Sequence, residues 1–122
     1  MWMVNPRILC RNHLLGEHKE LHMIIGHFRL GRSISGYIKN NCIEPLSVIK
    51  RHYVIVAEME RRNYNHKSPM ILLQDELDGV SEYLPENERN YRVDAGSSFL
   101  DLIGRCDECR TRADDISNNV YI

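Results

Sequence analysis

The chain has 122 residues, of which 43% are hydrophobic and 27% are charged. This length suffices for one hydrophobic core, so we expect a single domain covering residues 1–122. The composition excludes a disordered chain, and its apolar stretches are far shorter than the roughly 20 residues that span a bilayer. Residues 1–11 lack the apolar segment of a signal peptide, so we expect a cytoplasmic protein with no membrane partner.

The charge is unevenly distributed along the chain. Residues 1–67 carry 11 Lys and Arg against 5 Asp and Glu, a balance of +6, together with all 6 histidines. Residues 68–122 carry 5 against 12, a balance of −7, and the two halves sum to −1. A basic first half is typical of a polyanion-binding protein, although a solvated charged surface gives the same pattern.

The first predicted elements are a capped turn and a long helix. Asn5 followed by Pro6 is typical of an N-cap with proline at the first helical position. Residues 12–30 form an amphipathic helix by their apolar spacing, and residues 31–33 (GRS) end it. Residues 36–46 predict a loop or a short turn. The apolar stripe of this helix consists of Leu14, Leu21, Ile25 and Phe28.

A second helix is predicted over residues 46–62. Arg61 and Arg62 lie in its last turn, where they complement the helix dipole, and Asn63 can adopt the left-handed conformation of a C-terminal cap. The inner stripe predicted for this helix consists of Leu46, Ile49, Tyr53 and Val56.

The rest of the chain predicts one long loop and one more helix. Residues 65–92 are polar and interrupted by prolines, so we expect an extended loop with one turn near residues 74–81. Ser98 to Asp101 reads as a capping box that opens the third helix. The sequence therefore predicts an all-α domain of three main helices with long connecting loops, the first helix crossing the third. The inner stripe of the third helix consists of Phe99, Leu102, Ile103 and Cys106.

The first helix also has a polar side at the edge of its apolar stripe. A turn of about 100° per residue groups five residues there, and Glu20 is the carboxylate of most interest. Desolvation beside apolar surface can raise the pKa of a carboxyl group toward the range useful for acid–base chemistry. By periodicity alone, a solvated helix face is the better explanation. The five residues are His13, Glu17, Glu20, Ile24 and His27.

Metal and cofactor motifs are incomplete. His18 and His22 are four residues apart but do not form HExxH, and the Glu-x-x-His pairs of a di-iron bundle are missing. Cys106 and Cys109 form a CxxC pair, which is half of a zinc signature. Cys10 and His13 would complete it if the first and last helices meet; otherwise the cysteines are small apolar residues. We expect reduced thiols, zinc that is absent or substoichiometric, no metal-binding residues and no cofactor.

Three segments resemble a known family. Residues 13–22 (HLLGEHKELH) are similar to the first-helix signature of the pyrimidine-dimer DNA glycosylases. Residues 57–69 (AEMERRNYNHKSP) resemble the end of the second helix in its long bacterial and viral branch, and residues 105–109 (RCDEC) a later segment of that branch. The ten-residue match in the first helix is the most specific, and residues 70–96 match little.

The resemblance implies a DNA repair glycosylase with AP-lyase activity. In this family an N-terminal α-amine attacks C1′ of the damaged nucleotide, an imine forms as the base leaves, and β-elimination cuts the strand. α-Amines are partly neutral near physiological pH and can therefore act as nucleophiles. Mapped onto this chain, the nucleophile is the amine of Met1, because Trp2 is too large for ordinary methionine removal. The acid–base residue is Glu20.

The implied partner is double-stranded DNA with a lesion, bound by a monomer. His13 and Lys19 match positions that face DNA in the family, and Arg105 matches a basic residue near the phosphates. The basic first half adds Arg51, His66 and Lys67 as expected phosphate contacts. A base in duplex DNA must leave the stack during recognition, which a poorly stacked damaged site makes easier.

Two other functions stay open at this point. Aligned without gaps through the first helix, the chain begins two residues after the start of the phage-type enzymes, about 7 Å of extended chain. If the amine of Met1 does not reach the site, the protein is a family relative that binds DNA or a protein without chemistry. The third possibility is a zinc-stabilised helical protein that uses the four Cys and His residues named above.

Overall fold

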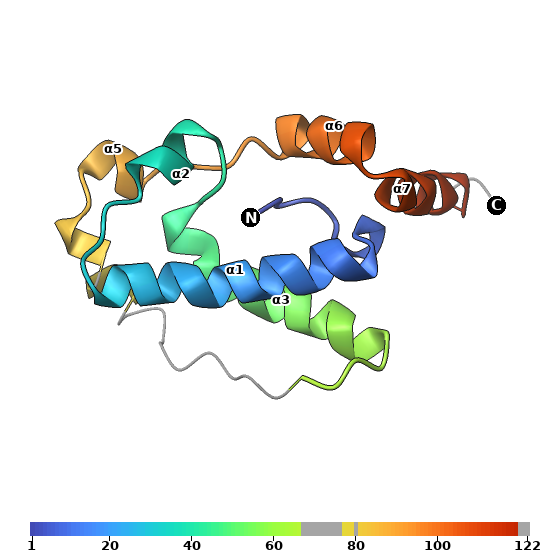
Figure 1. Ribbon diagram of the computed structural model, residues 1–122, viewed down its shortest axis with the longest axis horizontal. Coiled ribbons are helices and arrows are strands. Elements are labelled where there is room, and N and C mark those ends of the chain that lie inside the picture. Colours follow the sequence, from blue (N-terminus) through green and yellow to red (C-terminus); the bar gives the residue numbers. More distant parts are fainter. Residues whose placement is uncertain (67–76, 80, 120–122) are drawn as a thin grey trace.

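The computed structural model is built from helices (Figure 1). It describes residues 1–66, 77–79 and 81–119, and over these ranges it contains no strand, which confirms the all-α prediction. None of the helices described is both long and apolar enough to cross a membrane. The shorter elements are α2 (Ser35–Lys39), η2 (Pro45–Ser47), η3 (Ser81–Tyr83) and α5 (Glu86–Arg89).

The longest helix is α1, Arg11–Arg29, close to its predicted bounds. Its predicted apolar stripe is buried throughout. The helix ends because Gly31 adopts a φ of +63°, which a residue without a Cβ does at little cost. The amides of Gly31 and Arg32 then donate to the carbonyls of Phe28 and His27, a pattern that satisfies the last carbonyl groups of the helix.

The second long helix is α3, Val48–Arg61, which packs along α1 (Figure 1). Asn63 has a φ of 63° and ends it as predicted. Two predictions about packing are wrong. The main partner of α1 is α3 rather than the third predicted helix, and Tyr53 is exposed because the buried face is rotated. The apolar residues of that face are Val48, Ile49, Ile55, Val56 and Met59.

Residues 1–10, which we call the leader, fold back across α1 and α3. Asn5 caps the turn η1 (Pro6–Ile8) by accepting from the amide of Arg7 at 3.0 Å, as the Asn5-Pro6 pair predicts. Arg62 reaches from the end of α3 to the carbonyls of Pro6 and Leu9, at 3.1 and 2.7 Å. The leader is therefore tied to α3 by side-chain to main-chain hydrogen bonds.

The predicted third helix is two helices, α6 (Ala95–Arg105) and α7 (Asp107–Asn119). The predicted capping box is wrong, because Asp94 is the N-cap and its carboxylate accepts from the amide of Ser97 at 3.1 Å. Asp94 is held in place by Asn41, whose side chain bonds both its amide and its carbonyl. The break between the helices falls at Cys106, whose backbone is extended, and α7 packs on η1.

Glu58 ties the end of α3 together and makes stability depend on pH. Burial raises the pKa of this carboxyl group, but hydrogen bonds and charges from Arg61 and Arg62 outweigh burial and leave the pKa below its ordinary value of 4.5. The ionised carboxylate thus stabilises the fold above pH 4.5, and this contribution is lost as the pH falls through the lowered pKa.

We therefore expect Glu58→Gln to destabilise the protein at pH 7 by about 1.5–3 kcal/mol, the usual range for charge-assisted hydrogen bonds. In thermal unfolding, the difference from wild type should shrink as the pH is lowered below 4.5. Glu60→Gln is the control, because Glu60 is exposed on the same helix. A difference that stays constant from pH 7 to pH 3 would contradict this assignment.

Candidate active site

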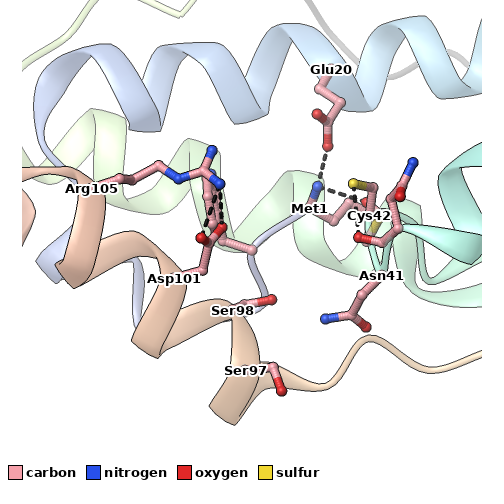
Figure 2. A pocket seen from close by; sticks show the side chains of 10 residues that line it. Met1, Glu20, Asn41, Cys42, Ser97, Ser98, Asp101 and Arg105 are labelled. Atoms are coloured by element: carbon pink, nitrogen blue, oxygen red, sulfur yellow. Dashed lines mark hydrogen bonds and ion pairs between the residues drawn. The ribbon is translucent and has the colours of Figure 1, made fainter.

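The α-amine of Met1 lies against the carboxylate of Glu20. The two groups form an ion pair and hydrogen bond, and the amine also donates to the carbonyl of Cys42 at 2.9 Å (Figure 2). The Met1 side chain is fully buried, with its sulfur 3.4 Å from the amide of Glu44, while the Glu20 side chain remains 38% exposed. Residues 1–10 therefore fold so that the Met1 amine contacts the predicted carboxylate.

A buried ion pair holds the residues that follow Met1. Glu17 on α1 and Arg51 on α3 are 3% and 5% exposed and bond each other through both carboxylate oxygens. Glu17 also accepts from the amide of Trp2 at 3.2 Å, and Arg51 donates to the carbonyl of Val4 at 2.8 Å. Between these two anchors, Met3 has a φ of 57°, in the left-handed region that bulky residues rarely adopt. This turn directs Met1 toward α1.

A cavity of about 520 Å³ opens beside the amine (Figure 2). One wall is α6, which presents Ser97, Ser98, Asp101 and Arg105, and another wall is formed by residues 40–42, which follow α2. Glu20 and Trp2 complete the lining, so the amine and the carboxylate both face this space. Its size is within the range of pockets that hold small molecules or single nucleotides.

The cavity is polar and carries both positive and negative charge. Its cations are the Met1 amine and Arg105, and its anions are Glu20 and Asp101. Arg105 donates to Asp101 one helical turn earlier, at 2.9 Å, and lies over the Trp2 ring at 5.8 Å. Arg105 is 60% exposed, so it can exchange the weak ion pair for another anion at little cost.

The predicted DNA-binding residues differ in whether they are exposed, buried or at the cavity. Lys19 is exposed beside Glu20, next to a second and smaller hollow on α1, and Arg105 lines the main cavity. Arg51 does not fit the prediction of a phosphate contact, because it is buried and its guanidinium is occupied by Glu17 and Val4. Lys67 lies outside the described residues.

His13 and His66 belong to two separate clusters of metal-binding side chains. His13 lies with Cys10, Cys106 and Cys109, and His66 lies with His18, His22 and His52. Within each cluster the potential ligand atoms are all within 4.8 Å of one another. Both histidines are half-buried in these clusters rather than displayed for phosphates. Either cluster could hold a metal ion, and neither includes a residue of the amine–carboxylate pair.

Several residues of the cavity were missed by sequence reasoning. The backbone carbonyl of Cys42 binds the amine, yet a carbonyl leaves no mark on residue type. Asn41 lines the cavity with a φ of 57°, and the Asn40-Asn41 pair after a short helix is a turn signal that could have been noticed. Ser98 was predicted to start a helix rather than to line a site, and no role was predicted for Ser97.

Comparison with known proteins supports one family. Residues 1–72 match the family model described as pyrimidine dimer DNA glycosylase. The matched range includes Met1, Glu20 and the Glu17–Arg51 pair, whereas α6 and α7 lie beyond it. No curated protein and no solved structure gives a significant match.

Proposed function

This chain belongs to the pyrimidine dimer DNA glycosylase family, and we propose that it is a DNA repair glycosylase with AP-lyase activity. The proposed nucleophile is the Met1 amine, the proposed acid–base residue is Glu20, and the substrate is a damaged or abasic nucleotide in duplex DNA. The observation that carries this proposal is the direct contact between amine and carboxylate at the wall of the polar cavity.

The contact supplies what amine catalysis requires. An ammonium group is not nucleophilic, so the amine must lose a proton before it attacks, and the Glu20 carboxylate lies where it can accept that proton. The Cys42 carbonyl fixes the direction of the amine, which restricts it to one orientation toward the cavity. The partial exposure of Glu20 leaves the same carboxylate open to a sugar placed in the cavity.

The proposed chemistry is imine formation followed by elimination. Glu20 takes one proton from the Met1 ammonium, and the nitrogen then bonds to C1′ as the bond from C1′ to the base breaks; Glu20 returns this proton to the leaving base. The nitrogen passes a second proton to Glu20, which delivers it to O4′ as the C1′–O4′ bond opens, and this yields a protonated imine and a free O4′ hydroxyl. Loss of a proton from C2′ then expels the 3′ phosphate, which cuts the strand. Throughout, the carboxylate offsets the positive charge that develops on the sugar.

The groups around the amine suit a nucleotide drawn out of the stack. Ser97, Ser98 and Asn41 offer hydroxyl and amide groups at the cavity wall, and Arg105 can pair with a phosphate at its mouth. Lys19 is exposed one residue before Glu20 and adds a cation on α1 beside this carboxylate. We propose Lys19 and Arg105 as the phosphate contacts nearest the reaction.

The test is borohydride trapping with a duplex that contains one abasic site. The purification tag should be placed at the C-terminus, so that the N-terminus stays free. It should be removable and contain no histidines. We expect a covalent complex after reduction, and peptide mass spectrometry should place the DNA remnant on the nitrogen of Met1. A variant with two residues added before Met1 should trap no DNA although all its lysines are intact.

Two outcomes would contradict the proposal. A wild-type protein that traps neither abasic nor dimer-containing DNA, while binding both, would be a family relative that works by binding alone. Trapping on a lysine, unaffected by the N-terminal extension, would show that the Met1 amine is not the nucleophile.

A further inference from the structure

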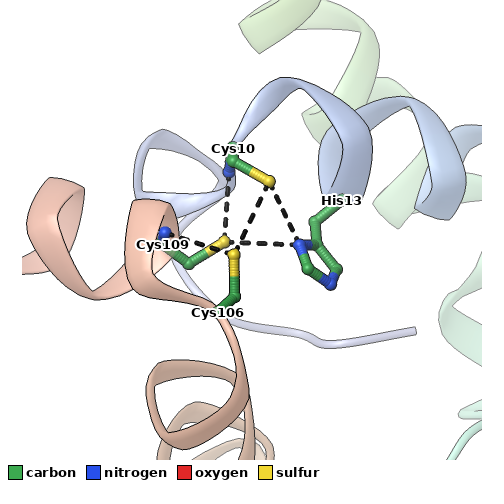
Figure 3. A group of neighbouring side chains, drawn as sticks. All are labelled: Cys10, His13, Cys106 and Cys109. Atoms are coloured by element: carbon green, nitrogen blue, oxygen red, sulfur yellow. Dashed lines mark hydrogen bonds between the residues drawn. The ribbon is translucent and has the colours of Figure 1, made fainter.

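Three cysteines and one histidine converge where the leader meets the last two helices (Figure 3). Cys10 immediately precedes α1 and His13 lies in its first turn, while Cys106 occupies the break between α6 and α7 and Cys109 the first turn of α7. From this geometry we propose that Cys10, His13, Cys106 and Cys109 bind one structural zinc ion. One zinc ion per chain replaces the expectation of absent or substoichiometric zinc. The sequence alone left open whether the Cys10–His13 pair meets the Cys106–Cys109 pair.

The distances match a tetrahedral zinc site. Bond lengths of about 2.3 Å to sulfur and about 2.0 Å to nitrogen give tetrahedral edges of about 3.8 Å between sulfurs and about 3.5 Å between sulfur and nitrogen. The sulfurs of Cys10 and Cys106 are 3.9 Å apart. Nδ1 of His13 lies 3.5 Å from the Cys109 sulfur and 3.1 Å from the Cys10 sulfur.

Backbone amides donate hydrogen bonds to two of the sulfurs in this cluster. The amide of Cys10 donates to the sulfur of Cys109 at 3.2 Å, and the amide of Cys109 donates to the sulfur of Cys106 at 3.5 Å. These bonds favour thiolates, and that of Cys109 helps to lower the pKa of the Cys106 thiol. Burial instead raises the pKa of Cys109 to about 12, a cost that a bound divalent cation offsets.

The ligand set indicates a structural rather than a catalytic ion. Four protein ligands fill the tetrahedron and leave no position for water or substrate. Cys10 and Cys109 are buried, which closes the site further. An ion here would tie the start of α1 to the junction that positions Arg105, and His13 also packs edge-on against Trp2 beside the amine. Cys10 and His13 lie within the range matched by the family model, whereas Cys106 and Cys109 lie beyond it.

The test is the metal content of the untagged protein, which does not depend on DNA activity. Protein purified without added metal should contain zinc, and Cys106→Ser and Cys109→Ser should each remove one zinc per chain. Cys42→Ser is the matched control, because Cys42 is a half-buried cysteine outside the cluster. Cobalt substituted for zinc should show a thiolate charge-transfer band that is lost in the two cluster variants and kept in the control.

A strong chelator provides a second measurement that does not require the variants to fold. It should release the zinc from wild type and lower its melting temperature, and added zinc should restore both. Wild type that takes up no zinc at this cluster, with its cysteines present as free thiols or as a disulfide, would overturn the proposal.

A separate cluster carries a second proposal of the same kind. His18 and His22 on α1, His52 on α3 and His66 after α3 place their imidazoles together, with ring centroids about 5 Å apart for several pairs (4.8 Å for His18 and His22). Nε2 of His66 is 3.1 Å from Nε2 of His18, close to the roughly 3.3 Å between two nitrogens on a tetrahedral zinc ion. We infer that these four histidines bind a divalent transition-metal ion, for which zinc is the probe.

The position and chemistry of this cluster fit such an ion. His18 precedes Glu20 by two residues and therefore lies about 200° around α1 from it. His18 and His22 are thus on the side of α1 that faces α3, away from the cavity. Imidazole suits zinc, copper and nickel. An ion here would fasten the chain after α3 to α1.

The expected result is a second zinc ion that is independent of the first. His66→Gln and His18→Gln should each bind one zinc fewer than wild type and keep the thiolate–cobalt band, whereas His27→Gln, a histidine outside the cluster, should lose none. Isothermal titration of zinc into metal-free Cys106→Ser protein should still show one tight site. If that titration shows no tight site, or if His66→Gln binds as much zinc as wild type, the histidine proposal fails while the cysteine site stands or falls on its own variants.

Discussion

Glu20→Gln should slow base release and borohydride trapping by about 10²–10⁴-fold, the usual cost of removing one positioned acid–base group. The amide keeps the shape of the side chain and can still accept a hydrogen bond from the Met1 amine. It cannot take up the proton that the amine must lose, and it carries no charge to offset the cationic sugar. The rate should be measured in single-turnover experiments with saturating DNA, so that it reports chemistry rather than affinity.

Binding separates this explanation from a loss of structure. Affinity for abasic duplex at fixed salt should change by no more than a few-fold, because the lost carboxylate contributes only repulsion toward phosphates. Glu60→Gln removes the same charge from an exposed position on α3 and should leave both rate and affinity unchanged. If Glu20→Gln releases base at the wild-type rate, Glu20 is not the acid–base residue.

Arg51→Met should slow borohydride trapping although Arg51 does not line the cavity. The reason is that Arg51 holds residues 1–10, and with them the Met1 amine, in place. The substitution removes the bond to the Val4 carbonyl and leaves Glu17 buried without its cation. Breaking a buried ion pair from one side typically costs about 3–5 kcal/mol, so the single variant should also be strongly destabilised. Thermal unfolding measures this cost, and single-turnover trapping measures the effect on the amine.

The double variant Glu17→Met with Arg51→Met distinguishes positioning from folding. Replacing both charges by unbranched apolar side chains removes the unpaired carboxylate, so the double variant should be more stable than either single variant. It should still trap DNA more slowly than wild type at saturating DNA, because the anchors of Trp2 and Val4 are gone. Wild-type trapping by a well-folded double variant would mean that the ion pair serves stability alone.

The positions and ends of helices were predicted correctly where they depend on neighbouring residues. The stripe of α1, its glycine stop and the Asn63 cap all follow from the spacing and conformational preferences of neighbouring residues. The third helix was predicted less well. Ser98 offered a capping pattern, but Asp94 is held by Asn41 from a distant part of the chain and starts the helix earlier.

The roles of charged residues were predicted poorly where burial decides the outcome. Arg51 and Lys19 look alike in a count of basic residues, yet one is buried in an ion pair and the other is exposed. His13 and His66 were expected to contact DNA, although each contacts metal-binding side chains from a distant part of the chain, His13 the sulfur of Cys109 and His66 the imidazole of His18. The positive balance of residues 1–67 therefore predicted a polyanion as partner, but it did not identify the residues that contact it.

The amino-acid sequence alone predicts the all-α class, the buried stripe of α1 and, through the resemblance of residues 13–22, the role of Glu20. Which distant groups meet follows only from the packing of the folded chain. The Met1 amine and Glu20 are 19 residues apart, His18 and His66 are 48 apart, and Cys10 and Cys109 are 99 apart. Such contacts depend on how the leader and the helices pack, because helical periodicity fixes only which residues share a face and not which face of another element they will meet.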